Sequence, residues 1–168
     1  MIKKMLPRYA VTDVKKLDRS FYEENGIKAV IFDIDNTLVK HTQAVPTKEI
    51  HEYLENLKLW GIKFGVVSNN SKERVENFCR ELGIRGYYRA FKPRKKYLKK
   101  AIEAFGCSES EICFVGDQIF TDIYGANRMK FVPVLVSAVG EDETGFVSFK
   151  RRFEKKILKK YAPNLTYL

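Results

Sequence analysis

The chain of 168 residues carries 31 Lys and Arg against 21 Asp and Glu, a net charge of +10 at pH 7, and 45% of its residues are hydrophobic. This size and composition fit one globular domain with a full-sized core. Apolar runs such as Ala29–Phe32 are too short for a membrane-spanning helix, and the N-terminus lacks an apolar region of signal-peptide length. The positive charge favours anionic partners (phosphorylated small molecules, acidic lipid surfaces or nucleic acid) without choosing among them.

The three cysteines, Cys79, Cys107 and Cys113, form no C-x-x-C pair and have no His cluster nearby. An odd number of cysteines without such a pattern predicts buried free thiols in a reduced cytoplasmic setting.

Apolar strands and amphipathic helices alternate along the chain after a mixed N-terminal arm. Short apolar runs predict strands over residues 27–32, 62–70, 87–91, 111–117 and 131–138. Apolar residues at helical spacing predict helices over residues 47–61, 71–83, 94–106 and 121–129. Gly61 is placed to end the first helix and Ser71 to cap the second, and Ser108 and Glu111 have the spacing of a capping box.

Strands separated by single helices indicate an α/β fold with a doubly wound parallel sheet. We expect one domain over residues 1–168, with a core at about 27–136, a basic N-terminal arm at 1–26 and a basic C-terminal extension at 137–168. Ligands of such sheets bind beyond the carboxyl ends of the strands.

Polar residues follow four of the predicted strands. They are Asp33-Ile34-Asp35-Asn36-Thr37 after the first, Ser68-Asn69-Asn70 after the second, Lys92-Pro93 after the third, and Gly116-Asp117-Gln118 after the fourth, with Thr121-Asp122 just behind. Because the carboxyl ends of parallel strands meet at one edge of a sheet, these clusters are expected to converge there.

The converging residues suit metal-assisted phosphoryl transfer. Asp33, Asp117 and Asp122 offer a hard cation such as Mg²⁺ oxygen ligands, and a cation there relieves the repulsion between carboxylates. Lys92 and Ser68 are suited to bind the remaining oxygens of an anionic substrate. One carboxylate can attack phosphorus, and a second can act as acid and then as base.

The segments "DIDNTL", "VVSNN", "FKP" and "GDQIFTD" resemble, in order, the four motifs of the haloacid dehalogenase (HAD) superfamily of phosphohydrolases. The resemblance covers roughly residues 27–136 and is nearest to subfamily IIIA, the YqeG-like phosphatases. It implies a Rossmann-like core with the predicted strands in the order 3-2-1-4-5.

The resemblance also implies roles for individual residues. Asp33 is expected to be the nucleophile and Asp35 the general acid and base, with Thr37 supporting the Asp35 carboxylate. Ser68 and the backbone of Asn69 are expected to bind the phosphoryl oxygens, and Lys92 to neutralise the transferring group. Mg²⁺ is expected on Asp33, the main-chain carbonyl of Asp35, Asp117 and Asp122, the last directly or through water.

The intervals between the motifs leave no room for a sizeable cap domain. Residues 35–69 and 68–92 each accommodate one helix with short flanking segments. Superfamily members without caps often act on large or surface-bound substrates because the cleft stays open, although a neighbouring subunit of an oligomer can also close it.

Each motif alone has a simpler structural interpretation. Asp33 and Asp35 are compatible with capping a turn, Ser68 with a turn residue, Lys92 with a solvated lysine, and Asp117 and Asp122 with the acidic start of a helix. The functional interpretation is favoured because these explanations require four coincidences at one sheet edge.

The basic segment 149–163 places Phe149, Phe153, Ile157 and Tyr161 at i, i+4 spacing among seven Lys or Arg. It is compatible with a helix docked on the body, with an amphipathic helix on acidic lipid, and with a nucleic-acid or protein contact.

The sequence features and the resemblance leave two functional hypotheses. The first is a Mg²⁺-dependent phosphomonoester hydrolase, cytoplasmic or peripherally bound to membrane. The resemblance to YqeG-like phosphatases, together with the positive charge, implies phosphatidylglycerophosphate as its substrate, and a sugar phosphate or a nucleotide is the alternative. The second is a non-catalytic adaptor that binds RNA, ribosome or acidic membrane.

Overall fold

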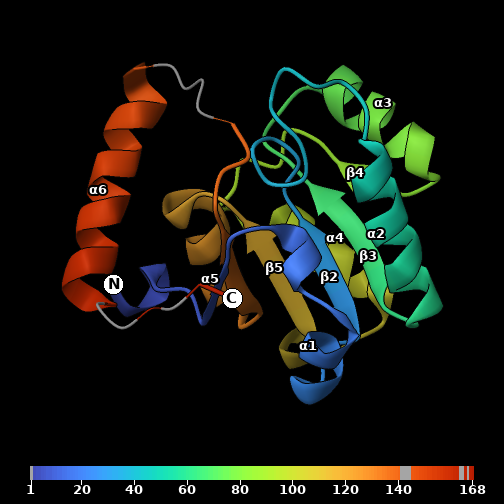
Figure 1. The fold of residues 1–168 in the computed structure, drawn as a ribbon, viewed down its shortest axis with the longest axis horizontal. Coiled ribbons are helices and arrows are strands. Elements are labelled where there is room, and N and C mark those ends of the chain that lie inside the picture. The colour runs from blue at the N-terminus through green and yellow to red at the C-terminus, as the bar shows by residue number, and fades with distance from the viewer. Residues whose placement is uncertain (1, 141–144, 163–164, 166) are drawn as a thin grey trace.

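The computed structural model describes residues 2–140, 145–162, 165 and 167–168, and describes residues 145–151 by their backbone alone. Strands and helices alternate through most of the chain (Figure 1). In chain order the elements are η1 (Ile2–Met5), β1 (Tyr9–Val11), η2 (Val14–Lys16), α1 (Arg19–Glu24), β2 (Ala29–Phe32), α2 (Lys48–Leu59), β3 (Lys63–Val67), α3 (Lys72–Leu82), β4 (Gly86–Tyr87), α4 (Lys96–Phe105), η3 (Glu109–Glu111), β5 (Ile112–Gly116), η4 (Ile119–Ile123), α5 (Tyr124–Met129), β6 (Val132–Val136) and α6 (Gly145–Tyr161).

The strands form one parallel sheet in the order β1-β6-β5-β2-β3-β4. The expected order 3-2-1-4-5 corresponds to β4-β3-β2-β5-β6, so the α/β fold class and this order are confirmed. The sheet continues beyond β6 through β1, where Tyr9 is in register with Val134. Sequence analysis did not predict β1, because three residues are too few to show an alternating pattern.

Helices cover both faces of the sheet and bury two apolar clusters. On one face, side chains of α1, α2 and α3 pack against alternate strand residues such as Val30, Phe32 and Val66. On the other face, α4 and α5 pack against the intervening residues, among them Ile31 and Phe114. Strands buried on both faces explain why the central strands are continuously apolar.

Side chains cap the start of two helices, and the cap at Ser71 was predicted. The Thr47 side chain accepts a hydrogen bond from the backbone N–H of Ile50, and the Ser71 side chain accepts one from that of Arg74. Gly61, just beyond α2, has a φ of 74°, a left-handed conformation that glycine adopts without steric cost.

Two elements differ from the predictions. The third strand was expected over residues 87–91, but β4 ends at Tyr87, because the positive φ angles of Arg89 and Phe91 are incompatible with an extended strand. The helix expected to begin at Thr121 begins earlier, as the single π-helical turn η4, and continues as α5. Such π-helical turns are rare and occur frequently at functional sites.

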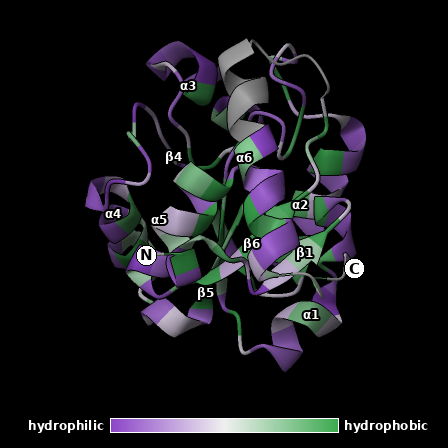
Figure 2. Ribbon diagram, turned by 90° about the vertical axis from the view of Figure 1, so that its left-hand side faces the viewer, coloured by the Kyte–Doolittle hydropathy of each residue, from purple (hydrophilic) through white to green (hydrophobic). Residues whose placement is uncertain are grey.

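The basic C-terminal segment forms α6, which lies beside the sheet (Figure 1) and displays many hydrophilic residues in the view of Figure 2. Leu158 packs against a third apolar cluster that contains Ile119 and Leu135. Phe153 and Tyr161, two residues of the apolar i, i+4 series, are 47% and 42% exposed. The side chain of Phe149 and residue Pro163, both in the predicted segment, lie outside the described residues.

None of the described helices combines the length and the apolar character needed to cross a membrane.

Candidate active site

The predicted polar clusters meet at the carboxyl edge of the sheet. Asp33 follows β2, Ser68 follows β3 and Asp117 follows β5, and both β3 and β5 pair with β2. The chain winds from β2 toward β4 on one side and from β5 toward β6 on the other, so this edge includes the topological switch point of the sheet. Doubly wound sheets bind their ligands at such a point.

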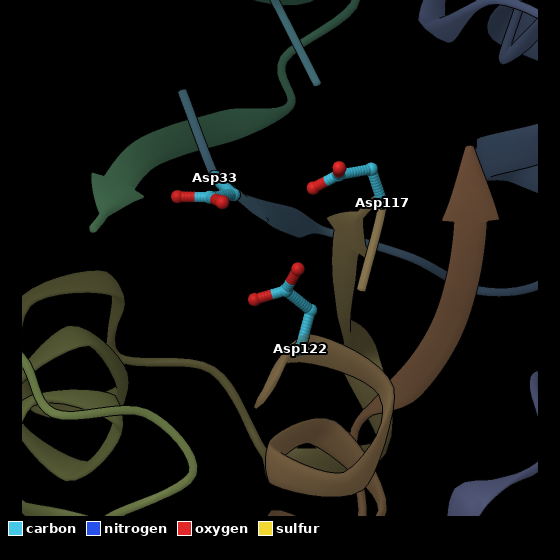
Figure 3. A group of neighbouring side chains, drawn as sticks. All are labelled: Asp33, Asp117 and Asp122. Atoms are coloured by element: carbon cyan, nitrogen blue, oxygen red, sulfur yellow. The ribbon is translucent and has the colours of Figure 1, made fainter. Parts of the chain in front are cut away.

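Three aspartates point toward one another at this edge (Figure 3). Asp33, Asp117 and Asp122 each offer a carboxylate oxygen, and these oxygens lie within 4.8 Å of one another. The three residues are 6%, 2% and 0% exposed. Three carboxylates removed from water repel one another, and a cation is the partner that relieves this repulsion.

Lys92 supplies one positive charge to this group. Its Nζ lies 2.8 Å from Asp33 Oδ1 and 2.8 Å from Asp122 Oδ1, and the side chain is buried. The three carboxylates with this single ammonium carry a formal charge of −2 when all are ionised.

The burial of these groups shifts their ionisation. Desolvation raises the pKa of Asp33 above its usual value, and the charges of Asp122 and Asp117 raise it further, while Lys92 lowers it. Desolvation alone would lower the pKa of Lys92, but Asp122 and Asp33 outweigh it and raise that pKa, so this lysine is charged at neutral pH.

The η4 turn brings Asp122 against β5. Asp122 Oδ2 accepts a hydrogen bond from the backbone N–H of Gln118 at 3.1 Å, and Oδ1 accepts one from the Thr121 hydroxyl at 3.2 Å. A Cβ at Gly116 would lie only 2.5 Å from Asp122, so glycine is required where the two segments meet.

Asp35 follows Asp33 by two residues but has different partners. Its Oδ1 accepts hydrogen bonds from Arg74 Nε at 3.2 Å and Nη2 at 3.0 Å, and its Oδ2 accepts one from Asn70 Nδ2 at 3.0 Å. Asp35 is less buried than Asp33 and faces the open side of the site.

Ser68 and Asn69 shape the loop after β3. Ser68 is buried, and its hydroxyl accepts a hydrogen bond from the backbone N–H of Asn70 at 3.1 Å. The Asn69 side chain accepts a hydrogen bond from the backbone N–H of Lys92 at 2.6 Å. Asn69 therefore holds the main chain of Lys92, a contact that the motif pattern did not predict.

Thr37 is fully buried and lies next to Asp117. Its hydroxyl donates a hydrogen bond to Asp117 Oδ1 at 3.4 Å. The sequence analysis expected Thr37 to support the Asp35 carboxylate instead.

The site opens into a pocket of about 340 Å³ at the protein surface. It is lined by Asp33, Asp35, Ser68, Asn69, Asn70, Lys92, Gln118 and Thr121. Among the described residues, no large cap covers it: residues 33–47 contain no helix, and α3 and β4 are the only named elements between Ser68 and Lys92.

The donor set fits a divalent cation with a preference for oxygen. Carboxylates are the ligands that Mg²⁺ takes from proteins, together with water and substrate phosphate oxygens. The formal charge of −2 and the mutual approach of Asp33, Asp117 and Asp122 fit such an ion. The structure thus brings all four predicted metal-binding residues, including Asp35, to one edge of the sheet.

Comparison with known proteins identifies relatives over nearly the whole chain. The model of the family described as haloacid dehalogenase-like hydrolase matches residues 39–136. The "Probable phosphatase YqeG" of Bacillus subtilis (strain 168) is 34% identical over 159 residues, which cover 94% of this chain and 92% of the relative. The "Phosphatidylglycerophosphate phosphatase 1, chloroplastic/mitochondrial" of Arabidopsis thaliana is 29% identical over 94% of this chain, which spans only 48% of that protein.

Solved structures share the fold at low sequence identity. An uncharacterised protein of Listeria monocytogenes serotype 4b aligns with a TM-score of 0.55 and 22% identity, covering 70% of this chain and 85% of its own. The cobalt-bound deoxy-D-mannose-octulosonate 8-phosphate phosphatase (YrbI) of Haemophilus influenzae aligns with a TM-score of 0.53 and 18% identity, covering 82% of this chain and 90% of its own. These matches support the fold, and the sequence relatives confirm the predicted resemblance to HAD phosphatases.

Sequence analysis missed two residues that contact Asp35. Asn70 was quoted within "VVSNN" but received no role, and Arg74 was counted only as part of the helix after Ser71. A single arginine in the first turn of a helix that also carries other basic and acidic residues gives no signal that distinguishes it from a solvated residue.

Proposed function

The chain belongs to the haloacid dehalogenase-like hydrolases, and on this premise we propose that it is a Mg²⁺-dependent phosphomonoester hydrolase that acts through an aspartyl-phosphate. The observation that carries the proposal is the convergence of three buried carboxylates and Lys92 beside an open pocket, which Asp33 and Lys92 line. The neighbouring Ser68 hydroxyl and the more exposed Asp35 complete the set of groups that this chemistry requires.

In the proposed reaction a carboxylate oxygen of Asp33 attacks phosphorus, and the bond between phosphorus and the leaving oxygen breaks. Asp35 donates a proton to that oxygen, and the alcohol departs. Asp35 then takes a proton from a water molecule that attacks the phosphoryl group, which releases inorganic phosphate and regenerates Asp33. Ser68 and the backbone of Asn69 hold phosphoryl oxygens, and Lys92 neutralises their charge.

Mg²⁺ held by Asp33, Asp117, the main-chain carbonyl of Asp35 and Asp122, the last directly or through water, would supply charge stabilisation to the phosphoryl group. Thr37 supports this arrangement through Asp117.

Turnover of 4-nitrophenyl phosphate by the purified protein tests the proposal. We expect EDTA to abolish the activity, Mg²⁺ to restore it and Asp33→Asn to lower kcat at least 1,000-fold, because the nucleophile is lost. Glu52→Gln, a change on the exposed face of α2, is the matched control and should retain wild-type activity. If the purified protein shows no EDTA-sensitive turnover and Asp33→Asn changes nothing, the proposal is refuted and the non-catalytic adaptor that binds RNA, ribosome or membrane is favoured.

For the substrate we propose phosphatidylglycerophosphate. The named activity of the Arabidopsis relative, the net charge of +10 and the open pocket support a large anionic substrate. A second pocket of about 390 Å³, lined by Asp117 and by apolar residues such as Leu135 and Leu158, offers space for an apolar group. We expect kcat/KM for this lipid to exceed that for glycerol 3-phosphate, a sugar phosphate and a nucleotide, and equal values would refute the assignment.

We also propose that α6 makes a peripheral contact with acidic membrane. Its exposed Phe153 and Tyr161 lie among lysines, the composition of helices that bind anionic lipid surfaces. Flotation with anionic liposomes should weaken when Lys156 and Lys160, both exposed, are changed to Glu, and unchanged flotation would contradict the contact.

A further inference from the structure

The guanidinium of Arg74 uses all of its nitrogens in contacts within the protein. Nε and Nη2 donate to Asp35 Oδ1 at 3.2 Å and 3.0 Å, and Nη1 donates to the carbonyl oxygen of Ala44 at 2.8 Å. The Arg74 and Asp35 side chains are 13% and 19% exposed, so this ion pair is mostly shielded from solvent. Hydrogen bonds between charged partners are stronger and more directional than neutral ones.

The position of Arg74 is itself fixed. Its backbone N–H is capped by Ser71 at the start of α3, and its guanidinium lies 5.7 Å from the ring centroid of the buried Phe78. The contact with Ala44 joins α3 to the segment that connects β2 to α2. Arg74 thus connects the first turn of α3 to two points of the segment between β2 and α2, Asp35 and Ala44.

Asn70 holds the other oxygen of the same carboxylate. Its Nδ2 donates to Asp35 Oδ2 at 3.0 Å, while its Oδ1 accepts from the backbone N–H of Ser71 at 2.7 Å. Asn70 lines the open pocket together with Asp35, whereas Arg74 is not among the residues that line it. Arg74 therefore contacts Asp35 from outside the lining of this pocket.

We propose that Arg74 is a positioning residue that orients the Asp35 carboxylate for proton transfer. The inference rests on the proposed function, in which Asp35 is the acid and base. Arg74 fixes Oδ1 with two N–H groups and leaves Oδ2 beside Asn70 at the pocket wall. Its bond to Ala44 restrains the segment between β2 and α2, so that Asp35 is held from two directions.

A carboxylate that transfers a proton must lie within hydrogen-bond reach of the leaving oxygen, and small displacements are costly. Without Arg74, the Asp35 side chain gains rotational freedom. The loss should be largest for leaving groups that need a proton, and small for leaving groups that depart as stable anions.

Two aryl phosphates and a double-mutant cycle test this proposal. The leaving group of phenyl phosphate is a phenol like that of tyrosine, with a pKa of about 10, whereas 4-nitrophenol is a more acidic and better leaving group. We expect Arg74→Ala to lower kcat for phenyl phosphate roughly 10- to 100-fold, within the contribution of general acid catalysis, and for 4-nitrophenyl phosphate only a few-fold. KM should change little for either substrate. Arg74→Lys, which keeps the charge without the planar fork, should be intermediate. Arg80→Ala, on the exposed side of the same helix, is the matched control.

In an Asp35→Asn background, Arg74→Ala should cost almost nothing, because residues that act through one another are not additive. An equal loss with both aryl phosphates, a selective rise in KM or full additivity with Asp35→Asn would overturn the proposal. If Arg74→Ala does not fold, the loss of kcat with the two aryl phosphates is compared in Arg74→Lys instead. The turnover of the wild-type protein and its loss in Asp33→Asn test the proposed function independently of the role of Arg74. The NMR signal of Arg74 Nε–H, which should move in Asp35→Asn, reports on the contact without any activity.

Discussion

The contact between Gly116 and Asp122 predicts a large effect from the addition of one methyl group. Gly116 lies at the end of β5, and its φ is not positive, so alanine is compatible with its backbone. An alanine Cβ would nevertheless lie 2.5 Å from Cβ, Cγ and Oδ2 of Asp122. The Gly116→Ala variant therefore tests whether the packing of η4 on β5 positions the third carboxylate.

The size of the effect follows from this distance. Asp122 has to move by about 0.9 Å to reach the 3.4 Å at which ordinary contact begins. Asp122 is fully buried and bonded to Lys92 and to the backbone N–H of Gln118, so the movement strains those contacts as well. Overpacking of a well-packed interior costs about 1–3 kcal/mol, which in a chain of this size lowers Tm by roughly 2–12 °C.

Urea and thermal unfolding, monitored by circular dichroism in EDTA, measure this change. Gly125→Ala is the matched control, because its added Cβ would meet Leu98 and Pro93 at 3.6 Å, an ordinary contact distance. In helix α5 this substitution should be neutral or stabilising by up to about 1 kcal/mol. If Gly116→Ala unfolds within 0.5 kcal/mol of wild type, a margin typical of an inconsequential surface change, the reasoning about this contact is refuted.

Two further predictions concern the charges at the same edge. Asp117→Asn should raise the Tm of the metal-free protein by a few degrees, because it removes one of three mutually repelling carboxylates. It should also weaken the stabilisation that Mg²⁺ gives the wild-type protein, which is about 2.7 kcal/mol at a Mg²⁺ concentration of 100 times Kd. Thermal unfolding with EDTA and with Mg²⁺ measures both effects, and a variant Tm below that of wild type in EDTA would contradict the repulsion. Lys92→Met should instead destabilise the protein, lowering the free energy of unfolding in urea by about 3 kcal/mol, because Asp33 and Asp122 lose the cation between them. Lys95→Met, a change of an exposed lysine nearby, is the control, and equal stability of the two variants would contradict the ion pairs.

Local sequence was sufficient for most of the sheet. Runs such as Ala29–Phe32 are apolar throughout because helices cover both faces of the strand. This pattern can be recognised in the sequence without knowing which strands pair with it. The predicted cap at Ser71 acts over three residues, so it too can be recognised from local sequence. β1 and the early end of β4 were missed because a short edge strand depends on its neighbour, and because positive φ angles at Arg89 and Phe91 carry no sequence signature.

The order of the motifs along the chain also determined which residues to consider at the site. Asp33, Asp35, Ser68, Lys92 and Asp117 each follow a strand, and a parallel sheet aligns the ends of its strands whatever the helices between them contain. Convergence was therefore predictable from the chain alone.

Only the tertiary structure decided which of these groups touch. The sequence places Asp33 and Asp35 two residues apart, yet Asp33 is paired with Lys92 and Asp35 with Arg74. Neither cation is near its partner along the chain. Hydrogen bonds and ion pairs depend on ångström-scale distances and on side-chain direction, which packing sets and residue order does not. The sequence by itself specified an acidic sheet edge, and the fold divided its charges between a buried group of three aspartates with Lys92 and the separately held Asp35.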